Sequence, residues 1–87
     1  MHQYDVLASV KDSKNALRNR KRLGLAIRKR RESLGLSQES LAEASDCHRN
    51  YIGTVERGAQ NITIDMLTRF ADGLRCSVAE LAKEAHL

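Results

Sequence analysis

The sequence predicts an all-α domain of five short helices that contains a helix-turn-helix, and three observations support this prediction. The 87 residues include no proline and few aromatic residues, while Leu, Ala, Glu, Arg and Lys are abundant. Apolar residues recur at close to the 3.6-residue period of a helix. The stretch from Ser37 to Gly58 reads as two short helices joined by a tight turn. A chain of this length forms one small domain.

The central motif, residues 37–58, has clear boundaries. Ser37 is a good N-cap for a first helix, residues 45–47 form the turn, and Gly58 ends a second helix over residues 49–57. Small or branched residues stand where two closely crossing helices need them: Ala42, Ile52 and Val55. This packing leaves Arg49, Asn50 and Thr54 on the outer face of the second helix.

The segments before the motif differ in regularity. Residues 1–15 lack a clear helical period, and we expect a loosely ordered arm, with a short strand or an extra helix as alternatives. We expect residues 16–87 to form the domain that contains the helix-turn-helix. Its first helix covers residues 16–34, with Asn15 as a candidate cap and Gly35 as its end. The inner stripe of this helix is Leu23, Ala26, Ile27, Arg30 or Arg31, and Leu34.

Two helices follow the motif. Thr63 is expected to cap the first, and Ser77 with Glu80 forms the S-x-x-E capping box that starts the second. The expected buried residues of the first are Ile64, Leu67, Phe70, Ala71 and Leu74. Those of the second are Val78, Leu81 and Ala85.

Charge is distributed unevenly along the chain. Basic residues outnumber acidic ones ten to three up to Gly35, whereas acidic residues outnumber basic ones eight to five from Leu36 onward. A basic segment favours a polyanionic partner such as DNA, with a solvated helix face as the alternative. The clusters at residues 18–22 and 28–31 are therefore candidates for non-specific phosphate binding.

Several function classes lack a pattern in this sequence. We find no paired carboxylates, nucleophile constellation, glycine-rich phosphate loop or metal-ligand spacing, so we expect neither an enzyme nor a cofactor or metal. Cys47 and Cys76 are expected to be reduced thiols. No membrane span or signal peptide is recognisable, which makes a cytoplasmic protein the default.

The stretch from Leu23 to Leu81 resembles the Xre-type, lambda-repressor-like helix-turn-helix proteins. The most specific pieces are LGLSQESLA, YIGTVERG and LRCSVAEL. Small members of this family include phage repressors, restriction-modification controller proteins and antitoxins, and NITI after VERG is most similar to the controller proteins. This sequence departs from the pattern at Asp46 in the turn, at His48 where a small cap is common, and at Ile62 where proline is frequent.

The resemblance implies roles for particular residues. The resemblance implies that base contacts are made by His48, Arg49, Asn50 and Thr54. Phosphate contacts fall on Gln38, Tyr51, Arg57 and Asn61, and Gln38 also braces the recognition helix. A buried pairing of a helix 1 arginine with the glutamate of ERG falls on Arg31 and Glu56.

Side-chain chemistry agrees with these roles and leaves alternatives open. Arg49 can hold guanine O6 and N7, Asn50 can hold adenine N6 and N7, and Thr54 can touch a thymine methyl. Tyr51 is either a phosphate donor or a ring at the edge of the core. His48 contacts a base or senses pH. Cys47 precedes a helix, which lowers a thiol pKa, although a small packed residue is the favoured interpretation.

Two functions remain in view from the sequence. The first is a sequence-specific transcription regulator that binds a palindromic operator in double-stranded DNA as a homodimer, with half-sites about 34 Å apart. Its dimer surface is expected at Leu74, Val78, Leu81, Ala82 and Leu87, unless these belong to the core of one copy. The alternative is an antitoxin that binds a toxin protein and represses its own operon.

Overall fold

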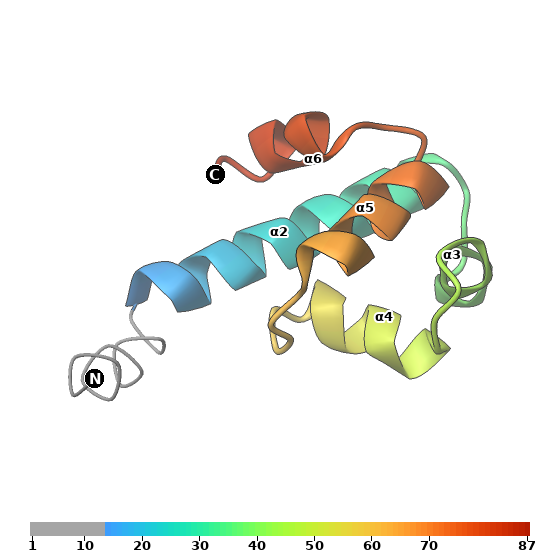
Figure 1. The fold of residues 1–87 in the computed structure, drawn as a ribbon, viewed down its shortest axis with the longest axis horizontal. Helices are drawn as coiled ribbons and strands as arrows, with labels where there is room; N and C mark the ends of the chain where they lie inside the picture. Colours follow the sequence, from blue (N-terminus) through green and yellow to red (C-terminus); the bar gives the residue numbers. More distant parts are fainter. Residues whose placement is uncertain (1–13) are drawn as a thin grey trace.

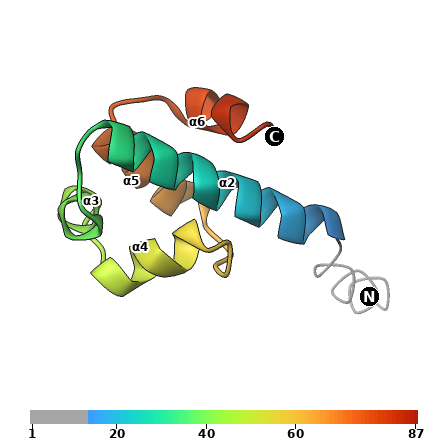
Figure 2. The same ribbon diagram turned by 180° about the vertical axis from the view of Figure 1, so that it is seen from behind.

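Five helices follow one another through residues 14–87, the part of the chain that the computed structural model describes. They are α2 (Lys14–Ser33), α3 (Gln38–Ala44), α4 (Arg49–Glu56), α5 (Ile64–Gly73) and α6 (Val78–Glu84). Figures 1 and 2 show the long helix α2 through the middle of the molecule, with α6 on one side and α4 on the other. The predicted all-α, five-helix fold is confirmed.

Helix α2 begins earlier than the sequence suggested. It starts at Lys14, so Asn15 lies inside its first turn and is not its cap. The helix thus starts two residues before the expected residue 16, and the division of the chain into an arm and a domain stays a prediction. Gly35, with a φ of 72°, follows the helix end as predicted. The expected loose order of residues 1–13 concerns a segment outside the described residues.

The predicted caps form at the later helices. The Ser37 hydroxyl accepts a hydrogen bond from the backbone N–H of Ser40 at 3.0 Å, and Thr63 accepts one from Met66 at 3.1 Å. Ser77 and Glu80 make both bonds of the capping box. Asp46 takes a φ of 54°, the left-handed conformation that its short polar side chain tolerates. The turn between α3 and α4 therefore forms without glycine.

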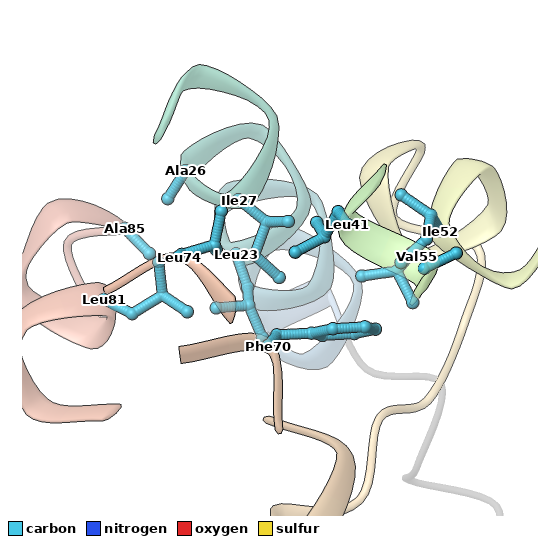
Figure 3. Packing of buried hydrophobic residues seen from close by; sticks show 11 residues of the cluster. Leu23, Ala26, Ile27, Leu41, Ile52, Val55, Phe70, Leu74, Leu81 and Ala85 are labelled. Carbon is cyan, nitrogen blue, oxygen red and sulfur yellow. The ribbon is translucent and has the colours of Figure 1, made fainter. Parts of the chain in front are cut away.

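One hydrophobic core joins all five helices. Figure 3 shows Leu23, Ile27 and Phe70 between two groups of side chains, with Leu41 and Ile52 in one group and α6 residues in the other. The buried apolar members are Leu23, Ala26, Ile27, Leu41, Ala42, Ile52, Val55, Phe70, Leu74, Leu81 and Ala85.

The expected burial of Ile64 is wrong. It is the first residue of α5, and its side chain is 68% exposed. The buried residues of α5 begin only at Phe70, so the first turn of this helix reaches past the edge of the core.

Two of the five residues expected at a dimer surface belong to the core of one copy. Leu74 and Leu81 are both 0% exposed, because α5 packs on α3 while α6 folds back onto α2 and α5. Neither side chain is therefore accessible for contact with a second copy of the chain. Leu87 is 55% exposed, and Val78 and Ala82 are half-buried.

The neighbouring arginines Arg30 and Arg31 have separate structural roles. Arg31 is buried beneath α4. Arg30 instead reaches the end of α5, where its Nε donates to the Leu74 carbonyl at 2.9 Å. Its Nη1 also bonds the Glu84 carboxylate at 2.8 Å. Arg30 thus fastens α2 to the elements on the side away from α4.

Gly24 sets the distance between α2 and α4. A Cβ atom at this position would lie 2.3 Å from the Val55 carbonyl oxygen and 2.7 Å from that of Glu56. Both obstacles are backbone atoms, which no side-chain rotation can move. Only glycine permits this crossing of the two helices.

Substitution of Gly24 by alanine tests the close crossing. Overpacking of this kind costs about 1–3 kcal/mol, so we expect Gly24→Ala to lower the free energy of unfolding by that amount. Alanine in an unobstructed helix would instead raise it by about 1 kcal/mol over glycine. Urea denaturation measures the difference, and a variant more stable than the natural chain would contradict the packing described here.

Candidate nucleic-acid interface

Helix α4 has one buried side and one open side. Ile52, Gly53 and Val55 pack inward against α2 and α3, which both contact α4. Arg49 and Asn50 are exposed, and Thr54 is half-exposed. The first helical residues thus present a guanidinium and an amide on the open side, both of which can make paired hydrogen bonds to a base edge.

His48 fixes the start of α4. Its Nδ1 accepts a hydrogen bond from the backbone N–H of Asn50 at 3.0 Å, so the imidazole is an N-cap in place of the usual Ser or Thr. This bond requires a lone pair on Nδ1, which puts the proton of the neutral ring on Nε2. The ring is exposed, and Nε2–H is left as a donor at the start of α4.

Thr54 is oriented by a bond to its own helix. Its hydroxyl donates to the Asn50 carbonyl at 2.9 Å, one turn earlier. The hydroxyl is therefore occupied, and the methyl group is the part of this side chain left for an apolar contact. That arrangement suits the methyl of thymine.

A buried ion pair holds α4 at an angle to α2. The Glu56 carboxylate accepts from Arg31 Nε at 2.6 Å and from Arg31 Nη2 at 3.0 Å. The two side chains are 4% and 10% exposed. The hydrogen bond to Glu56 raises the pKa of Arg31, against the opposing effect of burial. The arginine is therefore charged at every accessible pH.

Gln38 joins this pair from the first turn of α3. Its Nε2 donates to Glu56 Oε1 at 3.1 Å. The amide thus links the start of α3 to the last residue of α4. This is the bracing position that the resemblance assigned to Gln38.

A hollow of about 290 Å³ opens beside this network. Arg28, Gln38 and Arg57 line it together with Gly53. The absence of a side chain at Gly53 leaves room there, because its Cβ would lie 3.1 Å from Arg57 Nη1. Arg31 and Glu56 also line the hollow, but they neutralise each other, which leaves Arg28, Arg57 and the Gln38 amide to suit a phosphate group.

Arg28 and Gly53 were not singled out in this hollow from the sequence. Gly53 stands inside a helical pattern, where an isolated glycine signals a close approach of another group. Arg28 was recognisable only as one member of a basic cluster. The remaining phosphate candidate, Asn61, is exposed in the loop between α4 and α5.

Tyr51 packs as a ring at the edge of the core. Its centroid lies 6.0 Å from that of Phe70 in a tilted arrangement. Burial raises the pKa of the Tyr51 hydroxyl, with a smaller contribution from Cys47. The ring is half-buried, so the hydroxyl stays a neutral donor over the physiological range.

Cys47 does not have the environment of a reactive thiol. Burial raises its pKa, and Asp46 adds to this effect against the opposing influence of Arg69. The sequence-based idea that the start of α4 lowers this pKa is therefore wrong, since burial outweighs it.

Alkylation kinetics test the Cys47 environment. In a Cys76→Ala background, iodoacetamide at pH 8 is expected to modify folded Cys47 several-fold more slowly than the urea-unfolded chain, because thiolate is the reactive form. The raised pKa also means that this group favours folding while protonated, a contribution lost as the pH rises above the ordinary thiol range. Equal rates in both states would contradict the assignment.

Other classes of site are not evident in residues 14–87. Within them no three His, Cys, Asp or Glu side chains come together as metal ligands. The helices of this part of the chain are also too short or too polar to span a bilayer.

The geometry defines a helix-turn-helix protein, and the comparisons agree. The helix-turn-helix family model matches residues 27–81, and the chain belongs to that family. Control protein C.SmaI of Serratia marcescens is 47% identical over 55 residues. That match covers 63% of this chain and 66% of C.SmaI, just under two thirds of the relative's length.

Solved structures share the fold. The clp gene regulator ClgR of Corynebacterium glutamicum is 34% identical with a TM-score of 0.76, over 78% of this chain and 72% of its own. The restriction-modification controller protein C.Esp1396I, solved as a tetramer with its 35 base-pair operator, is 34% identical with a TM-score of 0.69. That alignment covers 79% of this chain and 96% of C.Esp1396I. The relatives are thus controllers and regulators.

Proposed function

We propose that this chain is a sequence-specific DNA-binding transcription regulator that acts as a homodimer. The observation that carries the proposal is the open side of α4, where exposed Arg49 and Asn50 project from a helix that the Arg31–Glu56 pair holds in place. A braced helix with base-reading side chains at its start fits the major groove. The likeness to C.SmaI and C.Esp1396I favours control of a restriction-modification operon.

Base reading and phosphate binding fall to different parts of this surface. Arg49 and Asn50 suit guanine and adenine, with Thr54 beside them for a thymine methyl. His48 Nε2–H is a further donor toward the groove. Around them the hollow with Gln38 and Arg57 suits one backbone phosphate, and the exposed Asn61 in the loop after α4 suits another. Tyr51 contributes only through its hydroxyl, since its ring belongs to the core edge.

The dimer surface is proposed on α6. Val78 and Ala82 lie one turn apart on the same face, and the exposed Leu87 follows them. Together they give an apolar strip that a two-fold axis would place against its own copy. A glutamate at Ala82 would put two like charges at the contact, so Ala82→Glu is expected to be monomeric in light scattering while its helix content is unchanged. If light scattering shows that the natural chain is a monomer at high micromolar concentration, the proposed α6 interface is wrong.

Selection of bound sequences from random DNA tests the function. We expect an inverted repeat whose half-sites lie about 34 Å, or one duplex turn, apart. A recovered pool without a shared motif would refute sequence-specific binding. A single unrepeated motif would refute the dimer but not the DNA contact.

The antitoxin alternative has no support from the relatives, which are named as control proteins and regulators. An enzymatic role has no candidate residues in the described part of the chain. We place the protein in the cytoplasm, where its DNA target is available.

A further inference from the structure

One face of α2, from Arg31 back to Lys21, lies against the C-terminal end of α4. Arg31 pairs with Glu56, and one to two turns earlier Gly24 meets the Val55 carbonyl. A turn before that, Lys21 lies under Gly58, whose Cβ would be 2.8 Å from the Lys21 Cα. Gly58 is the residue just beyond the C-cap of α4, so the contact between the two helices ends at Lys21.

Helix α2 continues past this point. Lys14 lies seven residues before Lys21, which is about 10 Å of helix. Positions three and seven residues away share a helix face, so Arg18 and Lys14 continue the face that met α4. In both ribbon views the first turns of α2 run beyond the end of α4 and slope toward its side of the molecule (Figures 1 and 2).

The cations on this projecting face have no side-chain partner within residues 14–87. Lys14, Arg18 and Lys21 are exposed and make no ion pair or hydrogen bond with any described residue. No acidic residue occurs in the sequence from Lys14 to Arg31. By contrast, Arg28, Arg30 and Arg31 all pair with glutamates. The basic cluster therefore divides into a structural half and an open half.

We infer that Lys14, Arg18 and Lys21 form a phosphate-binding strip that grips the DNA backbone outside the half-site read by α4. The inference rests on the proposed function, because it extends the DNA footprint beyond the end of α4. A projection of about 10 Å corresponds to about three base pairs at 3.4 Å each. The strip adds affinity without reading sequence, since lysine and arginine on phosphates carry no base information.

Two lengths of the selected operator test the strip. One duplex ends at the outer edges of the half-sites, and the other carries about five further base pairs of arbitrary sequence on each side. The natural chain is expected to bind the long duplex on the order of ten-fold more tightly at 0.1 M salt. Lys14→Gln with Arg18→Gln should remove this preference, lower the magnitude of the log–log salt slope by about 0.9 for each lost contact, and leave binding to the short duplex unchanged.

A matched control lies on the same helix. Arg22 and Lys29 are exposed and line the shallow hollow beside Glu84 and His86, on the α6 side. Arg22→Gln with Lys29→Gln removes the same charge, and it should keep the preference for the long duplex. The strip is refuted if the natural chain binds both duplexes equally, or if the control pair loses as much as the test pair. Sequence-selective binding of the short duplex in either case would leave the proposed function standing.

Discussion

Replacing Arg49 and Asn50 together by alanine is expected to reduce operator binding to the level of non-specific DNA binding. Each bidentate contact to a base supplies about 1–3 kcal/mol of discrimination, and a dimer makes the pair of contacts twice. Specific and non-specific binding typically differ by about 4–10 kcal/mol, so losing four such contacts removes most or all of the gap. Titrating the protein into a labelled operator and into a labelled scrambled duplex measures the difference in binding free energy.

The fold should survive this double substitution. Both side chains are exposed, and the Arg49–Glu39 pair, at 3.2 Å between groups that are 56% and 73% exposed, is worth about 0–1 kcal/mol. Thermal unfolding should therefore change little. Lys83→Ala, on α6 at the opposite side of α2, is the matched loss of one exposed cation and should keep its specificity. If the double variant still prefers the operator over the scrambled duplex by the natural factor, α4 does not read the DNA.

Local signals in the sequence predicted the fold well. The residues that cap helices, such as Ser37, Thr63 and Ser77, are recognisable because the caps depend on neighbours three residues away. The core stripe of α2 followed from its helical period. The start of α2 was placed late because polar, helix-compatible residues such as Asn15 do not mark a boundary by themselves.

Long-range features were harder to predict. The role of Gly24 depends on the α4 backbone that crosses it, and that of Gly53 depends on the side chains of Gln38 and Arg57 beside it. The residue spacing within one helix reveals neither neighbour. The burial of Leu74 and Leu81 depends on how α5 packs on α3 and how α6 folds back onto α2 and α5, so an apolar helix face alone did not distinguish core from dimer surface. The candidate base-reading residues were easier, because their exposure follows from the motif's own packing.

Removing the Glu56 side chain is expected to have the largest effect on stability. Glu56→Ala leaves the Arg31 side chain, which is only 10% exposed, with the Leu36 carbonyl at 2.8 Å as its remaining hydrogen-bond partner within residues 14–87. Breaking a buried pair by removing one member costs about 3–5 kcal/mol, a large part of the roughly 5–15 kcal/mol that stabilises a domain. At about 4–8 °C per kcal/mol, the melting temperature should fall by at least about 12 °C.

Two variants separate this pair from a general charge effect. Glu39→Ala removes an exposed carboxylate from a surface pair and should cost about 0–1 kcal/mol. Arg31→Met with Glu56→Leu removes both buried charges at once and should recover much of the loss, because no unpaired ion is left behind. Since Arg31 keeps its charge at accessible pH, the destabilisation of Glu56→Ala should be present at both pH 6 and pH 8. A Glu56→Ala melting temperature within a degree or so of the natural chain would mean that the pair does not hold α4 to α2, and the rigidity that DNA reading requires would have to come from the Gly24 crossing alone.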